Sequence, residues 1–115
     1  QRETLERIFK RLEASEVYIS RKYSEFTDKL FESILTLKNV EECYKFFEDI
    51  CTIKEIQSLS QRLEVAHLLQ QNKSYIEISK KTGASTATIS RVNRCFTYGT
   101  GGYKAALERL EKGEN

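Results

Sequence analysis

The segment spanning residues 74–96, SYIEISKKTGASTATISRVNRCF, is the part of the sequence that most constrains the fold. Its pattern predicts two short helices joined by a tight turn. Ser74 and Glu77 form an S-x-x-E capping box, which marks the start of the first helix. Gly83 stands where that helix must end, because a residue without a Cβ adopts the left-handed conformation at no steric cost.

A second helix is expected from Thr86 to about Phe96, with Ser85 as its N-cap. The small or apolar positions where the two helices should approach each other are Ser79, Gly83, Ile89 and Val92. The outer face carries short or cationic side chains, namely Thr86, Ala87, Thr88, Ser90, Arg91 and Arg94. Such a face can lie close to a DNA groove and hold phosphates at its flanks. This layout is typical of a helix-turn-helix DNA-binding motif, and a purely structural αα-hairpin is the alternative.

Cationic charge is concentrated around this segment. Between residues 72 and 107 six cations stand against one acid, Glu77, a net charge of +5, whereas the whole chain carries +2. The six are Lys73, Lys80, Lys81, Arg91, Arg94 and Lys104. Residues 23–71 hold nine acids and five bases, a net charge of −4. A DNA-binding surface needs clustered cations, so the acidic segment is interpreted as scaffold.

The composition favours one all-α domain without a membrane span. The sequence of 115 residues contains no proline, and four of its five glycines lie between Gly99 and Gly113. No apolar run approaches the roughly 20 residues that a bilayer requires, and no signal-peptide pattern opens the sequence. Cys43, Cys51 and Cys95 form no C-x-x-C pair, which indicates reduced cysteines and a cytoplasmic location.

Amphipathic helices are expected before the motif. Residues 2–14 carry apolar side chains on one side and predict an N-terminal amphipathic helix. Its mixed charges favour packing on a neighbour over a membrane surface. Ser24 should cap a helix that runs through Leu37 and closes at Lys38 and Asn39. A further helix is expected over residues 40–50.

A longer helix should follow from the T-x-x-E capping box of Thr52 and Glu55. One apolar stripe is expected along it, made of Ile53, Ile56, Leu59, Leu63, Ala66 and Leu69. After the motif, residues 97–102 predict a turn and residues 103–111 a last helix.

The aromatic side chains present more apolar surface than one short helix-turn-helix motif can bury. The aromatic side chains in question are Phe26, Phe31, Tyr44, Phe46 and Phe47. Surplus apolar surface on amphipathic helices favours burial between two subunits. The sequence therefore predicts a homodimer, and a monomeric helical bundle is the alternative.

No group of residues predicts catalysis or metal binding. His67 is the only histidine, no cysteine lies at metal-ligand spacing from it, and it is placed at a surface or boundary position. The glycine cluster at residues 99–102 follows no strand and is a weak nucleotide-binding signal. An enzyme is therefore not expected, nor a cofactor.

From about Tyr23 to Leu110 the sequence resembles the Trp repressor family, and within it the Trp-repressor-like YerC/YecD branch. The runs that carry the resemblance are EECYKFF from residue 41, IQSLSQRLEVA from residue 56 and GASTATISRV from residue 83. The resemblance implies an all-α, interlocked homodimer whose two helix-turn-helix motifs enter successive major grooves, about 34 Å apart. It also implies that Thr86, Ala87 and Thr88 approach bases, and that Ser90, Arg91, Arg94 and Tyr75 contact the backbone.

The sequence departs from the family at the amino-acid effector site. Arg62 and Arg91 match the two arginines between which tryptophan lies in the Trp repressor. The indole requires a glycine after the second arginine, but Val92 stands there, and Cys95 replaces a hydroxyl that meets the ligand's amino group. We expect valine to fill the indole space, so that tryptophan is not the corepressor.

The sequence thus predicts a cytoplasmic, homodimeric, sequence-specific DNA-binding regulator that represses transcription by steric blocking. Its contacts to double-stranded DNA are expected from Tyr75, Lys80, Ser85, Thr86, Ala87, Thr88, Ser90, Arg91 and Arg94. Residues 1–20 are assigned to an N-terminal extension and residues 21–115 to the helix-turn-helix domain. The alternatives are a helical adaptor that binds another protein, and a regulator with another small ligand at Arg62, Arg91, Val92 and Cys95.

Overall fold

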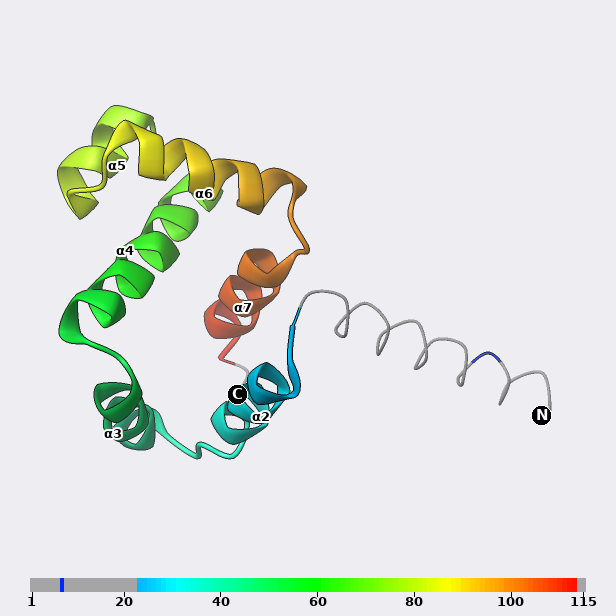
Figure 1. The fold of residues 1–115 in the computed structure, drawn as a ribbon. Helices are drawn as coiled ribbons and strands as arrows, with labels where there is room; N and C mark the ends of the chain where they lie inside the picture. Colours follow the sequence, from blue (N-terminus) through cyan, green and yellow to red (C-terminus); the bar gives the residue numbers. More distant parts are fainter. Residues whose placement is uncertain (1–6, 8–22, 114–115) are drawn as a thin grey trace. The chain divides into compact units, whose positions relative to one another are not determined.

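The structure is a computed structural model, which describes residue 7 and residues 23–113. Six helices and no strand are present in that part of the chain (Figure 1), which confirms the all-α class. They are α2 (Glu25–Ile34), α3 (Val40–Ile50), α4 (Ile53–Gln70), α5 (Tyr75–Thr82), α6 (Thr86–Tyr98) and α7 (Gly102–Glu111). The helix predicted over residues 2–14 lies outside the described residues, apart from Arg7. The chain divides into two compact units, residues 1–46 and 47–115.

The end of α2 differs from the prediction, because the helix stops at Ile34 rather than Leu37. The Ser33 hydroxyl donates to the Lys29 carbonyl at 2.9 Å. The Thr36 hydroxyl and amide both donate to the Ser33 carbonyl. Side-chain bonds of this kind compete with the helical ladder, and a three-residue bond tightens the last turn. Ser24 stands at the predicted N-cap position but makes no side-chain capping bond.

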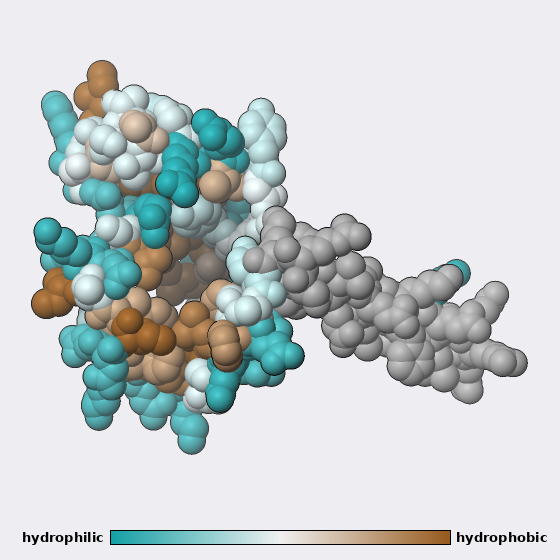
Figure 2. Space-filling model, in the orientation of Figure 1, coloured by the Kyte–Doolittle hydropathy of each residue, from teal (hydrophilic) through white to brown (hydrophobic). Residues whose placement is uncertain are grey.

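The helix α3 has the predicted bounds and a polar start. The Asn39 Oδ1 atom accepts from the Glu42 amide at 2.9 Å, and the Glu42 carboxylate accepts from the Lys38 amide at 2.9 Å. These bonds satisfy amides that have no partner within the helix. Both α2 and α3 expose aromatic side chains, and Figure 2 shows hydrophobic residues, in brown and tan, at the surface of the lower part of the view, where Figure 1 places these helices. Phe26 is 84% exposed, and Phe31 and Tyr44 are also more than half exposed.

The helix α4 begins with the predicted capping box. The Thr52 hydroxyl accepts from the Glu55 amide at 3.1 Å, and the Glu55 carboxylate accepts from the Thr52 amide at 2.8 Å. The predicted apolar stripe is not continuously buried. Its N-terminal members Ile53, Leu59 and Leu63 are exposed, whereas the buried residues of α4 are Val65, Ala66 and Leu68. The burial follows the contacts of α4 with α5, α6 and α7.

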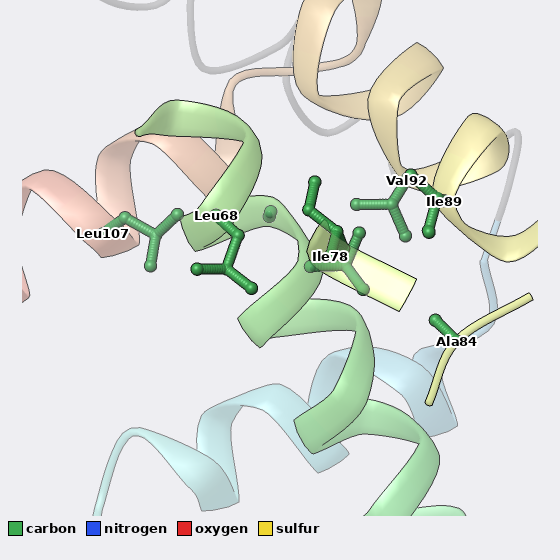
Figure 3. Packing of buried hydrophobic residues seen from close by; sticks show 8 residues of the cluster. Leu68, Ile78, Ala84, Ile89, Val92 and Leu107 are labelled. Atoms are coloured by element: carbon green, nitrogen blue, oxygen red, sulfur yellow. The ribbon is translucent and has the colours of Figure 1, made fainter. Parts of the chain in front are cut away.

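The core of the second unit lies where α4, α5, α6 and α7 meet (Figure 3). Its buried side chains are aliphatic: Val65, Ala66, Leu68, Ile78, Ala84, Ile89, Val92 and Leu107. Leu69, Tyr75, Phe96 and Tyr103 pack against them and are partly buried. Each helix gives one face to this core, so the opposite faces of α5 and α6 remain in solvent.

Candidate nucleic-acid interface

The first helix of the candidate interface, α5, starts at the predicted capping box. The Ser74 hydroxyl accepts from the Glu77 amide at 3.2 Å, and the Glu77 carboxylate accepts from the Ser74 amide at 3.4 Å. The helix ends at Thr82, directly before Gly83. Both predicted signals therefore mark the observed ends of α5.

The turn between α5 and α6 depends on a left-handed residue and on three side-chain bonds. Gly83 has φ of 75° and ψ of 4°, and its amide donates to the Ser79 carbonyl at 2.8 Å. The Ser79 hydroxyl donates to the Ala84 carbonyl at 2.9 Å, and the Ala84 amide donates to the Thr82 hydroxyl at 3.1 Å. The Gln61 side chain on α4 donates to the Thr82 carbonyl at 3.0 Å. The turn is thereby fixed to α4 as well as closed on itself.

The expectation that Gly83 allows the two helices to approach is wrong. A Cβ at Gly83 would meet nothing closer than the Gln61 side-chain nitrogen, at 4.0 Å. The glycine is needed for its backbone conformation alone. Sequence reasoning also missed Gln61, because a single amide on a neighbouring helix carries no local signal.

Gly83→Ala is expected to lower the free energy of unfolding by about 1–2 kcal/mol, the cost of the left-handed conformation for a residue with a Cβ. Urea denaturation followed by circular dichroism measures the change. Gly102→Ala is the matched control, because Gly102 opens α7, has no positive φ and leaves room for a Cβ. The control should be neutral or slightly stabilising. Equal losses in both variants would contradict this explanation.

The second helix, α6, is capped by Ser85, whose hydroxyl accepts from the Thr88 amide at 3.1 Å. Ile89 and Val92 are buried, as predicted. The helix continues to Tyr98, beyond the predicted end near Phe96. The Gly99 amide donates to the Cys95 carbonyl at 2.9 Å and completes this additional turn. We call residues 74–98 the α5–α6 unit.

The side chains predicted to contact DNA are all at least partly exposed. Those classed as exposed are Lys80, Ser85, Thr86, Ala87, Arg91 and Arg94. Tyr75, Thr88 and Ser90 are partly buried. Tyr75 packs against the core with part of its ring, and Thr88 accepts a hydrogen bond from the Ser85 hydroxyl at 3.1 Å. None of the nine is enclosed in the protein.

The cations of this region carry unneutralised charge. Lys73, Lys80, Lys81, Arg91, Arg94 and Lys104 are all exposed. Ion pairs in the described part of the chain involve Lys45 with Glu41, His67 with Glu64, and Lys112 with Glu108, and none of the six. The Nζ atom of Lys104 lies 5.3 Å from the centre of the Phe96 ring.

The pKa of Glu108, on the outer surface of α7, is lowered by its hydrogen bond from Lys112.

The residues matched to an effector site differ in their exposure to solvent. Arg62 is partly buried and lines a hollow of about 350 Å³ together with Cys51, Lys54, Glu55, Ser58 and Leu59. Val92 is 2% exposed and belongs to the aliphatic core. Arg91 and Cys95 are exposed on α6. Val92, which stands where the resemblance requires a glycine, is thus part of the aliphatic core.

Within residues 23–113 no helix has the length and apolar character to cross a membrane, and no cluster of ligating side chains could hold a metal ion. Cys43, Cys51 and Cys95 are free. His67 is half exposed, at the boundary position predicted for it.

Known proteins share both the sequence and the fold. A family model described as Trp repressor protein matches residues 25–111. The chain is 60% identical over 87 residues to the Bacillus subtilis protein described as Uncharacterized protein YerC. The aligned residues make up 76% of this chain and 84% of that protein.

Two solved structures are similar to this chain in both fold and sequence. A TrpR-like protein from Eubacterium eligens has a TM-score of 0.77 at 53% identity, over 80% of this chain and 95% of its own. A proposed Trp repressor from Staphylococcus aureus also has a TM-score of 0.77, at 49% identity, over 84% of this chain and 97% of its own. The chain therefore belongs to the Trp repressor family.

Proposed function

We propose that this protein is a sequence-specific DNA-binding regulator of transcription that acts as a homodimer in the cytoplasm, with α6 as its recognition helix. The observation that carries the proposal is the exposed outer face of the α5–α6 unit, with cations that no acid neutralises within the described residues. Unpaired cations on one face are the electrostatic footprint of a DNA-binding protein. Membership of a repressor family agrees with this assignment.

The proposed roles follow from position on the helices. Thr86, Ala87 and Thr88 form the first turn of α6, which is the part of a recognition helix that reaches base edges. Arg91 and Arg94 lie further along α6 and are assigned to phosphates. Backbone contacts from the flanks of the motif are assigned to Tyr75, Lys80, Ser85 and Ser90.

The homodimer is supported by the exposed rings of α2 and α3. Phe26, Phe31 and Tyr44 are each more than half exposed in a single chain, which is costly for aromatic side chains in water. A second copy of the chain would cover them and place two α6 helices for successive major grooves, about 34 Å apart. Repression would then follow from occupancy of the operator.

Selection of fragments from a random-sequence DNA pool tests this function. The wild-type protein should retain a common sequence, and the recovered duplex should shift in a gel at low salt and release at higher salt. A protein adaptor with a structural helix-turn-helix would retain no sequence. An unenriched pool would therefore reject the proposed function in favour of the adaptor.

Thr88→Ala is expected to reduce the preference for the selected duplex over a single-base variant by about ten-fold, the discrimination that one base contact supplies. Affinity for unrelated DNA should change little, since the substitution removes no phosphate-binding cation. Thr97→Ala is the matched control, because Thr97 is exposed near the other end of α6. An unchanged preference in Thr88→Ala would remove this residue from base recognition.

L-Tryptophan is expected to produce no heat of binding in calorimetric titration, because we propose that the side chain of Val92, which is buried, fills the space that the indole requires. Val92→Gly is the second variant for this titration, because it removes the side chain that is proposed to fill the indole space. Circular dichroism checks that this variant keeps its helicity. Heat from the wild type that fits micromolar affinity would contradict the proposed loss of the tryptophan site.

A further inference from the structure

Tyr98 is the most exposed aromatic side chain of the α5–α6 unit. It is the last residue of α6 and is 84% exposed, and its hydroxyl makes no hydrogen bond within the described residues. The Tyr98 ring is not among the side chains that pack against the core, so packing does not account for an aromatic residue at this position. It was expected in the turn after the motif, but the extended α6 makes it part of the recognition helix.

Helical geometry places Tyr98 on the same face as the two arginines of α6. Residues 91, 94 and 98 are separated by three and four positions, so their side chains lie within about 60° of each other around the axis. Arg91, Arg94 and Tyr98 are all exposed. Together they form one polar stripe, which we call the Arg91–Tyr98 stripe.

The backbone after Tyr98 keeps this ring uncovered. A Cβ at Gly99 would overlap the Cys95 carbonyl oxygen, so the turn that closes α6 at this point requires glycine. Thr100, Gly101 and Gly102 follow, and all three are exposed. The connection to α7 therefore brings no large side chain next to the ring.

The distance along the helix decides which part of DNA this end of α6 would meet. From Ala87 to Tyr98 the axial rise is about 16 Å. The major groove is only about 12 Å wide. When α6 enters the groove end-on with its first turn at the base edges, its last turn lies outside the groove, beside the phosphodiester backbone. There a phenol hydroxyl can donate to a phosphate oxygen, as uncharged donors commonly do.

We infer that Tyr98 is a DNA-backbone contact, in which its hydroxyl donates a hydrogen bond to a phosphate next to those bound by Arg91 and Arg94. The inference rests on the proposed function. The occupant of this surface is the DNA backbone rather than a partner protein, because the ring continues a stripe of unpaired cations. A neutral donor of this kind adds affinity for every sequence and releases no counterion.

Tyr98→Phe and Tyr98→Ala test the contact, with fluorescence anisotropy on two probes, sheared genomic DNA and the duplex selected by the wild type. Tyr98→Phe should weaken binding to both probes by at least about ten-fold, because each subunit of the homodimer loses one hydrogen bond to a charged acceptor. The slope of log affinity against log salt should stay unchanged, whereas Arg94→Ala should lower it. Tyr98→Ala should lose at least as much affinity as Tyr98→Phe.

Tyr23→Phe is the matched control, since it removes the same hydroxyl from an exposed tyrosine that precedes α2, outside the α5–α6 unit. It should leave both affinities unchanged. Tyr98→Phe within about two-fold of the wild type would overturn the inference, as would a loss of affinity accompanied by dissociation of subunits in light scattering. Wild-type protein that binds neither probe would instead reject the proposed function.

Discussion

Replacement of both Arg91 and Arg94 by alanine is expected to weaken DNA binding by about a thousand-fold at about 0.15 M salt. Each cation that neutralises a phosphate releases counterions and contributes about five-fold to affinity at that salt concentration. A homodimer carries four such arginines, all exposed and, within the described residues, unpaired by an acid. Fluorescence anisotropy over a range of salt concentrations measures both the affinity and the slope.

The salt slope separates a phosphate contact from a general loss of structure. It should fall by about 3.6 in the double variant, or about 0.9 for each lost contact. Lys29→Ala with Lys45→Ala is the matched control, because it removes two exposed cations from α2 and α3 in the acidic segment. The control should keep the wild-type slope. An unchanged slope in the arginine variant would exclude Arg91 and Arg94 from the interface.

Ile89→Ala is expected to lower the free energy of unfolding by about 3 kcal/mol. Ile89 is 0% exposed and packs in the core that joins α6 to α4 and α5 (Figure 3), so truncation leaves a cavity behind the recognition helix. Urea denaturation at fixed protein concentration measures the loss, since the stability of a dimer depends on its concentration.

The matched control for that variant is Ile76→Ala. Ile76 is 72% exposed on α5, so the same truncation there should change stability by less than about 0.5 kcal/mol. Comparable losses at the two positions would contradict the placement of α6 on this core. A stable Ile89→Ala variant would do the same.

Local chemistry explains why so much of the α5–α6 unit was predictable. The capping boxes at Ser74 and Thr52, the left-handed Gly83 and the cap at Ser85 each act within a few residues, and each is found where the sequence predicts it. The inward positions Ile89 and Val92 follow from helical periodicity. The resemblance of the sequence to the Trp repressor family is confirmed by the family match.

Features that depend on more distant contacts were less predictable. The helix α2 stops early because hydroxyls of Ser33 and Thr36 compete for carbonyls. Burial along α4 begins only where α5, α6 and α7 cover it, so periodicity alone overestimated the buried stripe. The last turn of α6, which contains Tyr98, depends on a hydrogen bond from the Gly99 amide to the Cys95 carbonyl. No capping residue in the sequence predicts that bond. The contact roles of the interface residues and the homodimer remain predictions.

The proposed mode of binding is that a homodimer presents two basic α6 helices to one DNA duplex. Its most direct test is the mass of the complex between wild-type protein and the selected duplex, with affinity followed as a function of salt. We expect two chains on each duplex and a log–log salt slope of about −3.6 or steeper, from the four arginines. One chain per duplex, or an affinity that does not change with salt, would contradict the claim.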